Sequence, residues 1–273
     1  MPELPEVETV VRGLRKALTG RRLARLSLWQ PVVVESDAAA FRKNTRNVDV
    51  RALRRRGKWI LLDLANRHTV LAHLRMTGKF SVVEATTPRE RHDHLQWTLD
   101  DGTFVLRFND QRRFGRFRLV PTFDVESFLQ SRGWGPEPFD ISRAEFALRL
   151  GRSRRSMKAA LLDQRVVAGL GNIYADEILF AAGIHPATPT IRVGPARRER
   201  VYTAMQDILT RAIAACGTSL QNFVAVDQRP GSFRQELCVF RRDGKPCPTC
   251  GATVSHTRLV GRSTHYCPRC QRW

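Results

Sequence analysis

Two Cys-x-x-Cys pairs near the carboxy terminus constrain the fold more than any other feature of the sequence. The pairs are Cys247 with Cys250 and Cys267 with Cys270, and 16 residues separate them. Each pair presents two thiolates from one tight turn, and two such turns can complete a tetrahedron around Zn²⁺. Four cysteine ligands leave no coordination position for water, so we expect one structural zinc ion on a β-hairpin module.

The chain carries a large excess of positive charge. Of its 273 residues, 46 are Lys or Arg and 26 are Asp or Glu, which gives a formal net charge of +20. Six of the 46 are lysines, so 40 are arginines, the side chain best suited to bidentate phosphate contacts. A coding bias could explain the Arg-to-Lys ratio but not the net charge. The charge therefore predicts a polyanionic partner, of which nucleic acid is the favoured kind.

Composition excludes several classes of protein. The hydrophobic fraction of 42% and the aromatic fraction of 8% predict a folded core. No uninterrupted apolar stretch of about 18 residues is present, so a membrane span is not expected. The opening MPELPEVE is acidic and does not resemble a secretory signal. We expect a cytoplasmic protein whose cysteines, including Cys216 and Cys238, stay reduced.

Periodicity predicts an α+β fold in three parts. Apolar residues recur at helical spacing over residues 5–18, and residues 21–120 contain short apolar runs typical of a β-sandwich or barrel. The Gly/Pro-rich segment 133–138 is a linker candidate, and helical patterns follow it. We expect domains at 1–132 (a β-sandwich with an attached helix), 133–234 (helical) and 235–273 (the zinc module).

The amino terminus could supply a nucleophile. Removal of Met1 would leave Pro2 with a secondary amine, and an α-amino group titrates at roughly pH 8, so part of it is neutral near pH 7. A neutral amine can attack an electrophilic carbon, and Glu3 beside it could transfer a proton. On this motif alone, an ordinary proline-rich helix start remains the better interpretation.

Further motifs change that interpretation. They are Arg56-Gly57-Lys58, His73-Leu74-Arg75-Met76-Thr77-Gly78, Asp110-Gln111-Arg112-Arg113-Phe114-Gly115, Gly169-Leu170-Gly171-Asn172-Ile173-Tyr174-Ala175 and the four-cysteine module. Read together and in order, these motifs make the chain resemble the bacterial formamidopyrimidine-DNA glycosylases, and the PELPE opening favours this branch over endonuclease VIII.

The resemblance implies a bifunctional enzyme of base excision repair that removes oxidised purines and cleaves the resulting abasic site. It implies that Pro2 is the Schiff-base nucleophile and Glu3 the proton donor. Lys58 would be the acid for β-elimination, and Arg262 the zinc-finger arginine that serves δ-elimination and phosphate binding. The expected partner is damaged double-stranded DNA, bound by a monomer.

The resemblance also implies a set of DNA contacts. Met76, Arg112 and Phe114 would fill the gap left by an extruded base, a helix-two-turn-helix element would lie around residues 169–182, and residues 218–233 would cover the lesion. The remaining contacts would be His73, His92, Arg154 and Asn172.

Simpler interpretations of these residues stay open. Met76 and Phe114 could be ordinary core residues, Lys58 a solvated strand end and Asn172 a helix cap. The alternative functions are an endonuclease VIII-like enzyme for oxidised pyrimidines, a non-catalytic zinc protein that binds damaged DNA, and an arginine-rich RNA-associated protein.

Overall fold

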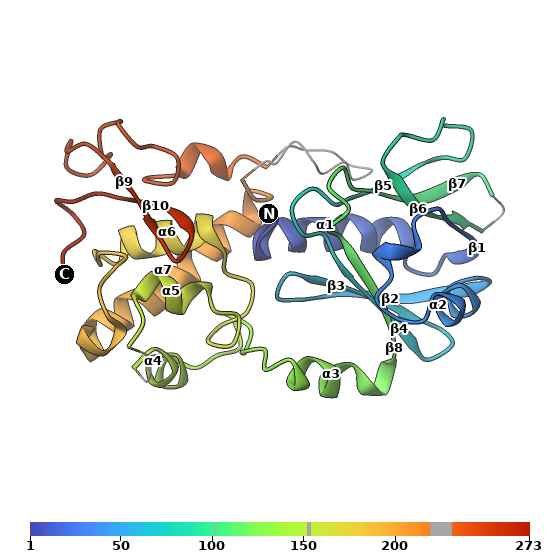
Figure 1. Cartoon of the computed structure of the whole chain (residues 1–273), viewed down its shortest axis with the longest axis horizontal. Coiled ribbons are helices and arrows are strands. Elements are labelled where there is room, and N and C mark those ends of the chain that lie inside the picture. The colour runs from blue at the N-terminus through green and yellow to red at the C-terminus, as the bar shows by residue number, and fades with distance from the viewer. Residues whose placement is uncertain (101, 152–153, 219–230) are drawn as a thin grey trace. The chain divides into compact units, whose positions relative to one another are not determined.

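The protein is described by a computed structural model that covers residues 1–100, 102–151, 154–218 and 231–273. Internal contacts divide the chain into two compact units (Figure 1). The sandwich unit is Met1–Arg132 with Ser219–Gly231, and the helical unit is Gly133–Thr218 with Ser232–Trp273. A separate zinc domain from residue 235 stays a prediction. No helix in the described part of the chain is long and apolar enough to cross a membrane.

The sandwich unit contains one antiparallel sheet that folds into two halves. Its strand order is β5-β7-β6-β1-β2-β3-β4-β8. Strands β1 and β2 pair at only two positions, so the halves β5-β7-β6-β1 and β2-β3-β4-β8 separate there. The predicted α+β class with an amino-terminal sandwich is confirmed. The strands are β1 (Arg22–Leu28), β2 (Val48–Arg56), β3 (Trp59–Leu64), β4 (His68–His73), β5 (Lys79–Glu84), β6 (Asp93–Leu99), β7 (Phe104–Asn109) and β8 (Arg116–Pro121).

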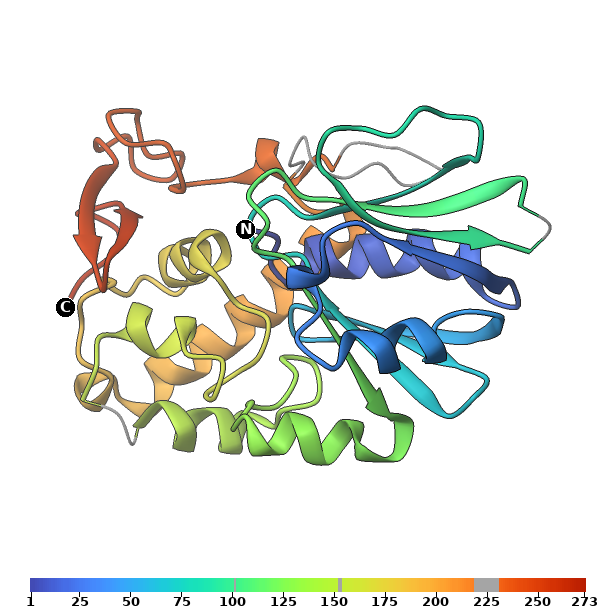
Figure 2. The same cartoon turned by 45° about the vertical axis from the view of Figure 1, so that its right-hand side comes forward.

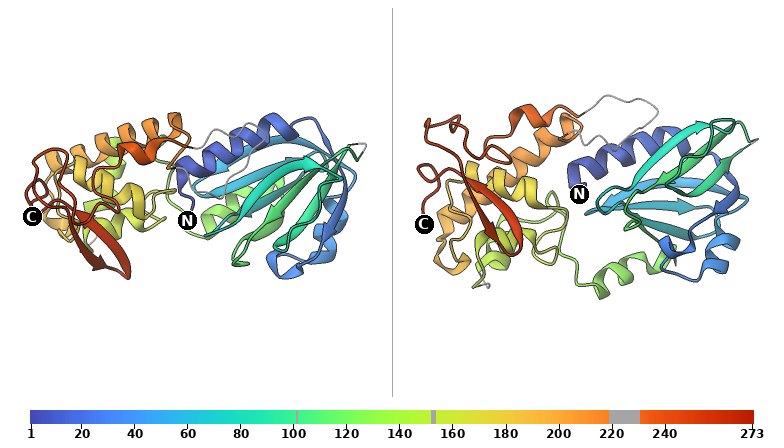
Figure 3. Two further views of the ribbon diagram at one scale, coloured as in Figure 1. Left: turned by 90° about the horizontal axis from the view of Figure 1, so that it is seen from above. Right: turned by 45° about the horizontal axis from the view of Figure 1, so that its top comes forward.

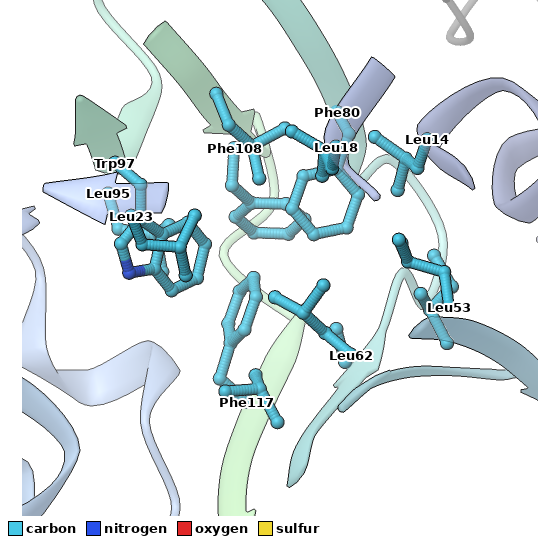
Figure 4. Packing of buried hydrophobic residues seen from close by; sticks show 14 of the residues in the cluster. Leu14, Leu18, Leu23, Leu53, Leu62, Phe80, Leu95, Trp97, Phe108 and Phe117 are labelled. Atoms are coloured by element: carbon cyan, nitrogen blue, oxygen red, sulfur yellow. The ribbon is translucent and has the colours of Figure 1, made fainter. Parts of the chain in front are cut away.

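Aromatic side chains fill the space between the two halves of the sheet (Figure 4). The ring of Phe117 on β8 lies 4.8 Å from that of Phe108 on β7 and 6.1 Å from that of Trp97 on β6, measured between centroids. Phe80 on β5 completes the cluster, and all four side chains are buried. Edge-on ring packing of this kind adds to the stability that apolar burial supplies.

Helix α1 (Leu4–Leu18) covers one side of this unit and packs against β2 and β3 (Figure 3). Its apolar face is buried, as the helical spacing predicts. Glu3 is the N-cap residue, and its backbone N–H donates to Glu6 Oε2 at 2.9 Å. This capping contact fixes the direction in which the first residues leave the helix. The remaining helical segments of the unit are η1 (Pro31–Val33), α2 (Ala38–Asn44), η2 (Thr122–Asp124) and α3 (Val125–Ser131).

The helical unit is built around α6, which packs against α7 and α5 (Figure 2). Its core contains the fully buried side chains of Phe146, Tyr174 and Phe233. Helix α6 begins at Asn172, which directly follows the N-cap residue Gly171. The elements are α4 (Arg143–Gly151), α5 (Met157–Leu162), α6 (Asn172–Ala181), η3 (Thr190–Arg192), α7 (Pro195–Ala214), η4 (Phe233–Glu236) and the antiparallel hairpin β9 (Ser255–Leu259) and β10 (Arg262–Tyr266).

We predict that Phe117→Ala lowers the free energy of unfolding by about 3–5 kcal/mol, because it opens a cavity at the centre of the aromatic cluster. Phe123→Ala is the matched control, since that side chain is 82% exposed and its loss should stay within about 0.5 kcal/mol. Urea titration followed by near-ultraviolet circular dichroism measures both. An equal loss of unfolding free energy in the two variants would contradict the assignment of Phe117 to the core.

Candidate functional site

Strand register places the predicted site residues of the sandwich unit at one end of the sheet. In one half, Trp59, His73 and Arg116 lie side by side on β3, β4 and β8. In the other half, Lys79, Asn109 and Asp93 lie side by side on β5, β7 and β6. The β4–β5 and β7–β8 turns join the two halves at this end. The turns and strand ends here contain Lys58, His73, Met76, His92, Arg112 and Phe114.

Lys58 lies in the two-residue turn between β2 and β3. Gly57 precedes it with φ +56°, a conformation that glycine adopts without strain and that tight hairpin turns require. Lys58 is only 7% exposed, so the interpretation as a solvated strand end is wrong. It lies close enough to His73 for its charge to act on that imidazole. Two predicted site residues therefore share one electrostatic environment.

His73 is held as a neutral imidazole. Its Nδ1 accepts the backbone N–H of Arg75 at 2.9 Å, and its ring packs edge-on against Trp59 at 4.9 Å. The pKa of His73 is lowered from 6.5 to about 3, chiefly by burial and further by the charges of Arg75 and Lys58. With Nδ1 accepting, the ring proton lies on Nε2, which makes that atom a hydrogen-bond donor.

The amino terminus is tied to the Lys58 turn. The guanidinium of Arg55 donates to Glu8 Oε2 on α1 at 3.0 Å and to the carbonyl oxygen of Gly57 at 3.2 Å. Pro2 and Glu3, which directly precede α1, are both buried, and Glu3 is 2% exposed. Arg55 thus links the start of α1 to the hairpin that carries Lys58, a role that the sequence motifs did not reveal.

The predicted gap-filling side chains are exposed at turn tips rather than packed in the core. Met76, between β4 and β5, is 37% exposed, and Phe114, between β7 and β8, is 45% exposed. The guanidinium carbon of Arg112 lies 4.7 Å from the centroid of the Phe114 ring. This geometry fits side chains that insert into another molecule.

His92 and His94 flank Asp93 at the start of β6, and only one of the two faces a fixed partner. Nε2 of His94 donates to the carbonyl oxygen of Asp110 at 2.6 Å. Nδ1 of His92 is buried and has no hydrogen-bond partner within the described residues. His94 is therefore fixed to the turn between β7 and β8.

The helical unit contributes a helix start and an exposed arginine. The side-chain Oδ1 of Asn172, at the start of α6, is buried without a hydrogen-bond partner in the described structure. The turn before it is shaped by Gln164, whose side chain accepts from the N–H of Gly169 at 2.9 Å and donates to the carbonyl oxygen of Leu170 at 2.8 Å. Arg154 is exposed ahead of α5.

The four predicted zinc ligands come together. The sulfur atoms of Cys247, Cys250, Cys267 and Cys270 all lie within 4.8 Å of one another. The pairs Cys247–Cys270 and Cys250–Cys267 have sulfur–sulfur distances of 3.9 and 3.5 Å. Zinc–sulfur bonds of 2.3 Å in a tetrahedron require about 3.8 Å, so the donor set fits one structural Zn²⁺.

The zinc hairpin presents Arg262 at its tip. Arg262 is exposed and starts β10, directly after the two-residue turn Val260-Gly261. His265, by contrast, does not lie near the tip. It is buried at the base of the hairpin, where its backbone N–H donates to Asp176 Oδ2 at 3.0 Å.

A buried ion pair anchors this hairpin to α6. Lys158 Nζ lies 2.6 Å from Asp176 Oδ1 and donates to the carbonyl oxygen of Ser263 at 2.7 Å. Glu177, next along α6, accepts the backbone N–H groups of Cys238, Val239 and Phe240 at 2.8–2.9 Å. No local sequence pattern reveals these anchors, because nothing local distinguishes an interior Asp-Glu pair from a solvated one. Residues 219–230, most of the predicted lesion-covering loop, lie outside the described residues.

We predict that His73 makes stability fall as the pH falls below 6.5. The unfolded chain protonates this histidine below about pH 6.5, whereas the folded chain does so only near pH 3, so the unfolded state binds more protons in this window. Against His73→Asn, the stability of the native chain should drop by about 1.4 kcal/mol per pH unit between about pH 6 and pH 4. Urea titrations at each pH measure this difference. Parallel pH profiles for the two proteins would show that His73 is not held neutral.

We also predict that the native chain binds one zinc ion and that Cys267→Ser loses it, because three thiolates no longer close the tetrahedron. Cys216→Ser should keep the metal, since Cys216 is exposed and lies outside the cluster. Elemental analysis after gel filtration reports the zinc content of each protein. Retention of a full zinc equivalent by Cys267→Ser would refute the assigned ligand set.

Sequence comparison assigns each part of the chain to one family. Residues 1–117 match the formamidopyrimidine-DNA glycosylase N-terminal domain, and residues 134–224 match the formamidopyrimidine-DNA glycosylase H2TH domain. Residues 244–272 match a zinc finger found in FPG and IleRS.

Comparisons over the whole chain point to the same family as the domain matches. Two relatives called formamidopyrimidine-DNA glycosylase, from Stenotrophomonas maltophilia and Alkalilimnicola ehrlichii, are 44% and 43% identical, with 100% of both chains covered. Among solved structures, a mutant Lactococcus lactis enzyme in complex with Fapy-dG-containing DNA is 34% identical, with a TM-score of 0.95 and 100% of both chains covered. The complex of that enzyme with abasic-site DNA is 33% identical, with a TM-score of 0.94 and 99% and 100% covered. The chain belongs to the formamidopyrimidine-DNA glycosylase family, whose members are DNA-repair enzymes.

Proposed function

We propose that this protein is a bifunctional DNA glycosylase and abasic-site lyase that removes oxidised purines from duplex DNA as a monomer. The observation that carries the proposal is the strand register that collects Lys58, His73 and the Met76 and Phe114 turns at one end of the sandwich. Relatives of this family have been crystallised with Fapy-dG and abasic-site DNA, which supports the same substrate class here.

Pro2 is the proposed nucleophile. While Met1 is attached, the Pro2 nitrogen is an amide and cannot attack; after Met1 is removed, it is a secondary amine. Its lone pair then forms a bond to the sugar C1′ as the bond to the damaged base breaks, and the base leaves with that electron pair. The nitrogen then loses its proton, and its lone pair expels the ring oxygen O4′ from C1′, which takes up a proton as the sugar ring opens. The opened sugar is joined to Pro2 as an iminium ion, which carries a positive charge without needing a proton.

Glu3 and Lys58 move protons in this scheme. Glu3 delivers a proton to the departing base or to the opening sugar ring, and it is the buried N-cap residue that directly follows Pro2. The iminium ion acidifies the C2′ hydrogen, so its removal expels the 3′ phosphate by β-elimination. Lys58 assists that departure as an acid, and a second elimination releases the 5′ phosphate.

The exposed turns hold the DNA open during this chemistry. A base cannot react inside the helical stack, so the nucleotide must rotate out at a cost of a few kcal/mol. Met76 and Phe114 occupy the vacated space, with Arg112 beside the Phe114 ring. His73 supplies an Nε2–H donor, and His92 a ring nitrogen, to the phosphate backbone.

Residues of the helical unit bind further phosphates. The start of α6, where Asn172 follows Gly171, is a helix N-terminus, whose backbone N–H groups and dipole favour a bound phosphate. Arg154 and Arg262 are exposed guanidinium groups suited to phosphate oxygens, and Arg262 assists the second elimination. The zinc ion supplies rigidity to the hairpin that carries Arg262.

A second candidate function is the removal of oxidised pyrimidines. A Lactococcus lactis relative, 34% identical, has been crystallised with DNA that contains an oxidised pyrimidine. Activity on thymine glycol in preference to 8-oxoguanine would favour this alternative.

The test is product formation from duplexes that contain 8-oxoguanine opposite cytosine, ring-opened guanine or thymine glycol. We predict that the native chain excises both purine lesions and nicks the strand. Pro2→Gly and Glu3→Gln should each lower single-turnover excision by at least about a hundredfold, because each removes a group that acts in the transition state. Denaturing gels separate intact, β-eliminated and δ-eliminated strands.

Glu145→Gln is the matched control for Glu3→Gln. Glu145 lies on α4, where it pairs with Arg149, and it has no role in the proposed chemistry. This control should keep near-native excision. Excision that survives both Pro2→Gly and Glu3→Gln would overturn the catalytic assignment.

A further inference from the structure

Asp110 stands at the junction of three segments that the proposed function uses. We infer that Asp110 is a positioning residue. It fixes the position of the Met76 turn relative to the Arg112–Phe114 turn, so that the side chains of both turns enter the duplex together. This inference rests on the proposed function and deepens it, because it assigns a task to a carboxylate outside the predicted site residues.

The side chain of Asp110 is fully buried and accepts hydrogen bonds from both turns. Its Oδ1 accepts the hydroxyl of Thr77, which follows Met76, and the backbone N–H of Arg112 at 3.2 Å. Its Oδ2 accepts the backbone N–H of Gly115 at 2.7 Å. Thr77 Oγ1 also receives the Arg112 N–H at 3.3 Å. One carboxylate and one hydroxyl therefore join two turns that are more than thirty residues apart in the sequence.

The backbone of Asp110 extends the same network to His92. Its N–H donates to the carbonyl oxygen of His92 at 3.0 Å, and its carbonyl oxygen receives Nε2 of His94. A shift of Asp110 would therefore move the predicted phosphate contact as well as the two inserting turns.

Each turn contains a strained backbone residue and packs closely against Phe108, so hydrogen bonds such as those of Asp110 are needed to hold its conformation. Arg75 and Arg113 adopt φ values of +54° and +57°, which non-glycine residues hold only when the surroundings enforce them. A Cβ atom on Gly78 or Gly115 would come within 2.9 or 2.4 Å of the Phe108 ring. Phe108 thus limits how closely the backbone of each turn approaches the core, and Asp110 fixes the position of one turn relative to the other.

The first experiment is hydrogen–deuterium exchange on the free proteins. Asp110→Asn preserves volume but replaces one acceptor oxygen with an NH₂ donor, which opposes the N–H groups it faces. We expect faster exchange in both turns, residues 74–78 and 110–115. Thr77→Val should loosen both turns in the same way, and Thr77→Ser should not. Asp49→Asn, a half-exposed carboxylate on β2 paired with Arg22, is the control.

The second experiment separates positioning from a general loss of fold. Single-turnover rates are measured on an 8-oxoguanine duplex, which requires base extrusion, and on a duplex with a preformed abasic site, which has no base to displace. We expect Asp110→Asn to slow excision by about ten- to hundredfold and abasic-site cleavage by less than about threefold. Thr77→Val should show the same split, with rescue in Thr77→Ser.

Each outcome decides one question. Equal losses of single-turnover rate on the two duplexes would overturn the inference, and so would faster hydrogen exchange confined to one turn. Native rates and native exchange in both Asp110→Asn and Thr77→Val would overturn it as well. If the native chain leaves both duplexes intact, the proposed function fails. Asp110 then keeps only the loop coupling that hydrogen exchange shows, and its task in base extrusion falls with that function.

Discussion

The packing of Phe108 against Phe117 is the contact on which the sandwich unit depends. Each ring comes from a different half of the sheet, and their centroids lie 4.8 Å apart, so this pair holds the halves together. The Phe108 ring also underlies Gly78 and Gly115, the glycines that end the two exposed turns. The core therefore sets the position of the site, because the same ring that excludes water between the half-sheets supports the turns that carry Met76 and Phe114.

The helical unit uses buried charge for a similar purpose. A buried ion pair is weak evidence for stability, since desolvation offsets much of its attraction, but it is demanding about geometry. Lys158 and Asp176 are both fully buried, and each also bonds the backbone of β10, at Ser263 and His265. Those two positions lie just after Arg262. The orientation of the hairpin tip thus depends on the zinc site, which includes Cys267 directly after β10, and on the ion pair that bonds β10 itself.

Much of this arrangement could be predicted from sequence, and the remainder has a physical reason. The zinc ligands and α1 follow local rules of spacing and periodicity, and five strands contain apolar runs. These five are β3, β4, β6, β7 and β8. In β1, β2 and β5, arginines and other polar residues interrupt the apolar pattern, so no run marks those strands. The depressed pKa of His73, the burial of Lys58 and the junction at Asp110 depend on partners far along the chain, so no local pattern could reveal them. Asp110 can contact both turns only because β4 pairs with β8, which brings the β4–β5 turn next to the β7–β8 turn.

The central claim is that the nitrogen of Pro2 becomes covalently bonded to the sugar of the damaged nucleotide. Borohydride reduction during turnover converts the iminium ion into a stable amine, and peptide mass mapping then locates the bond. The account predicts that the added nucleotide fragment lies on the peptide that begins with Pro2 and lacks Met1. An adduct on Lys58 or another lysine, or no adduct with a chain that nicks DNA, would contradict it.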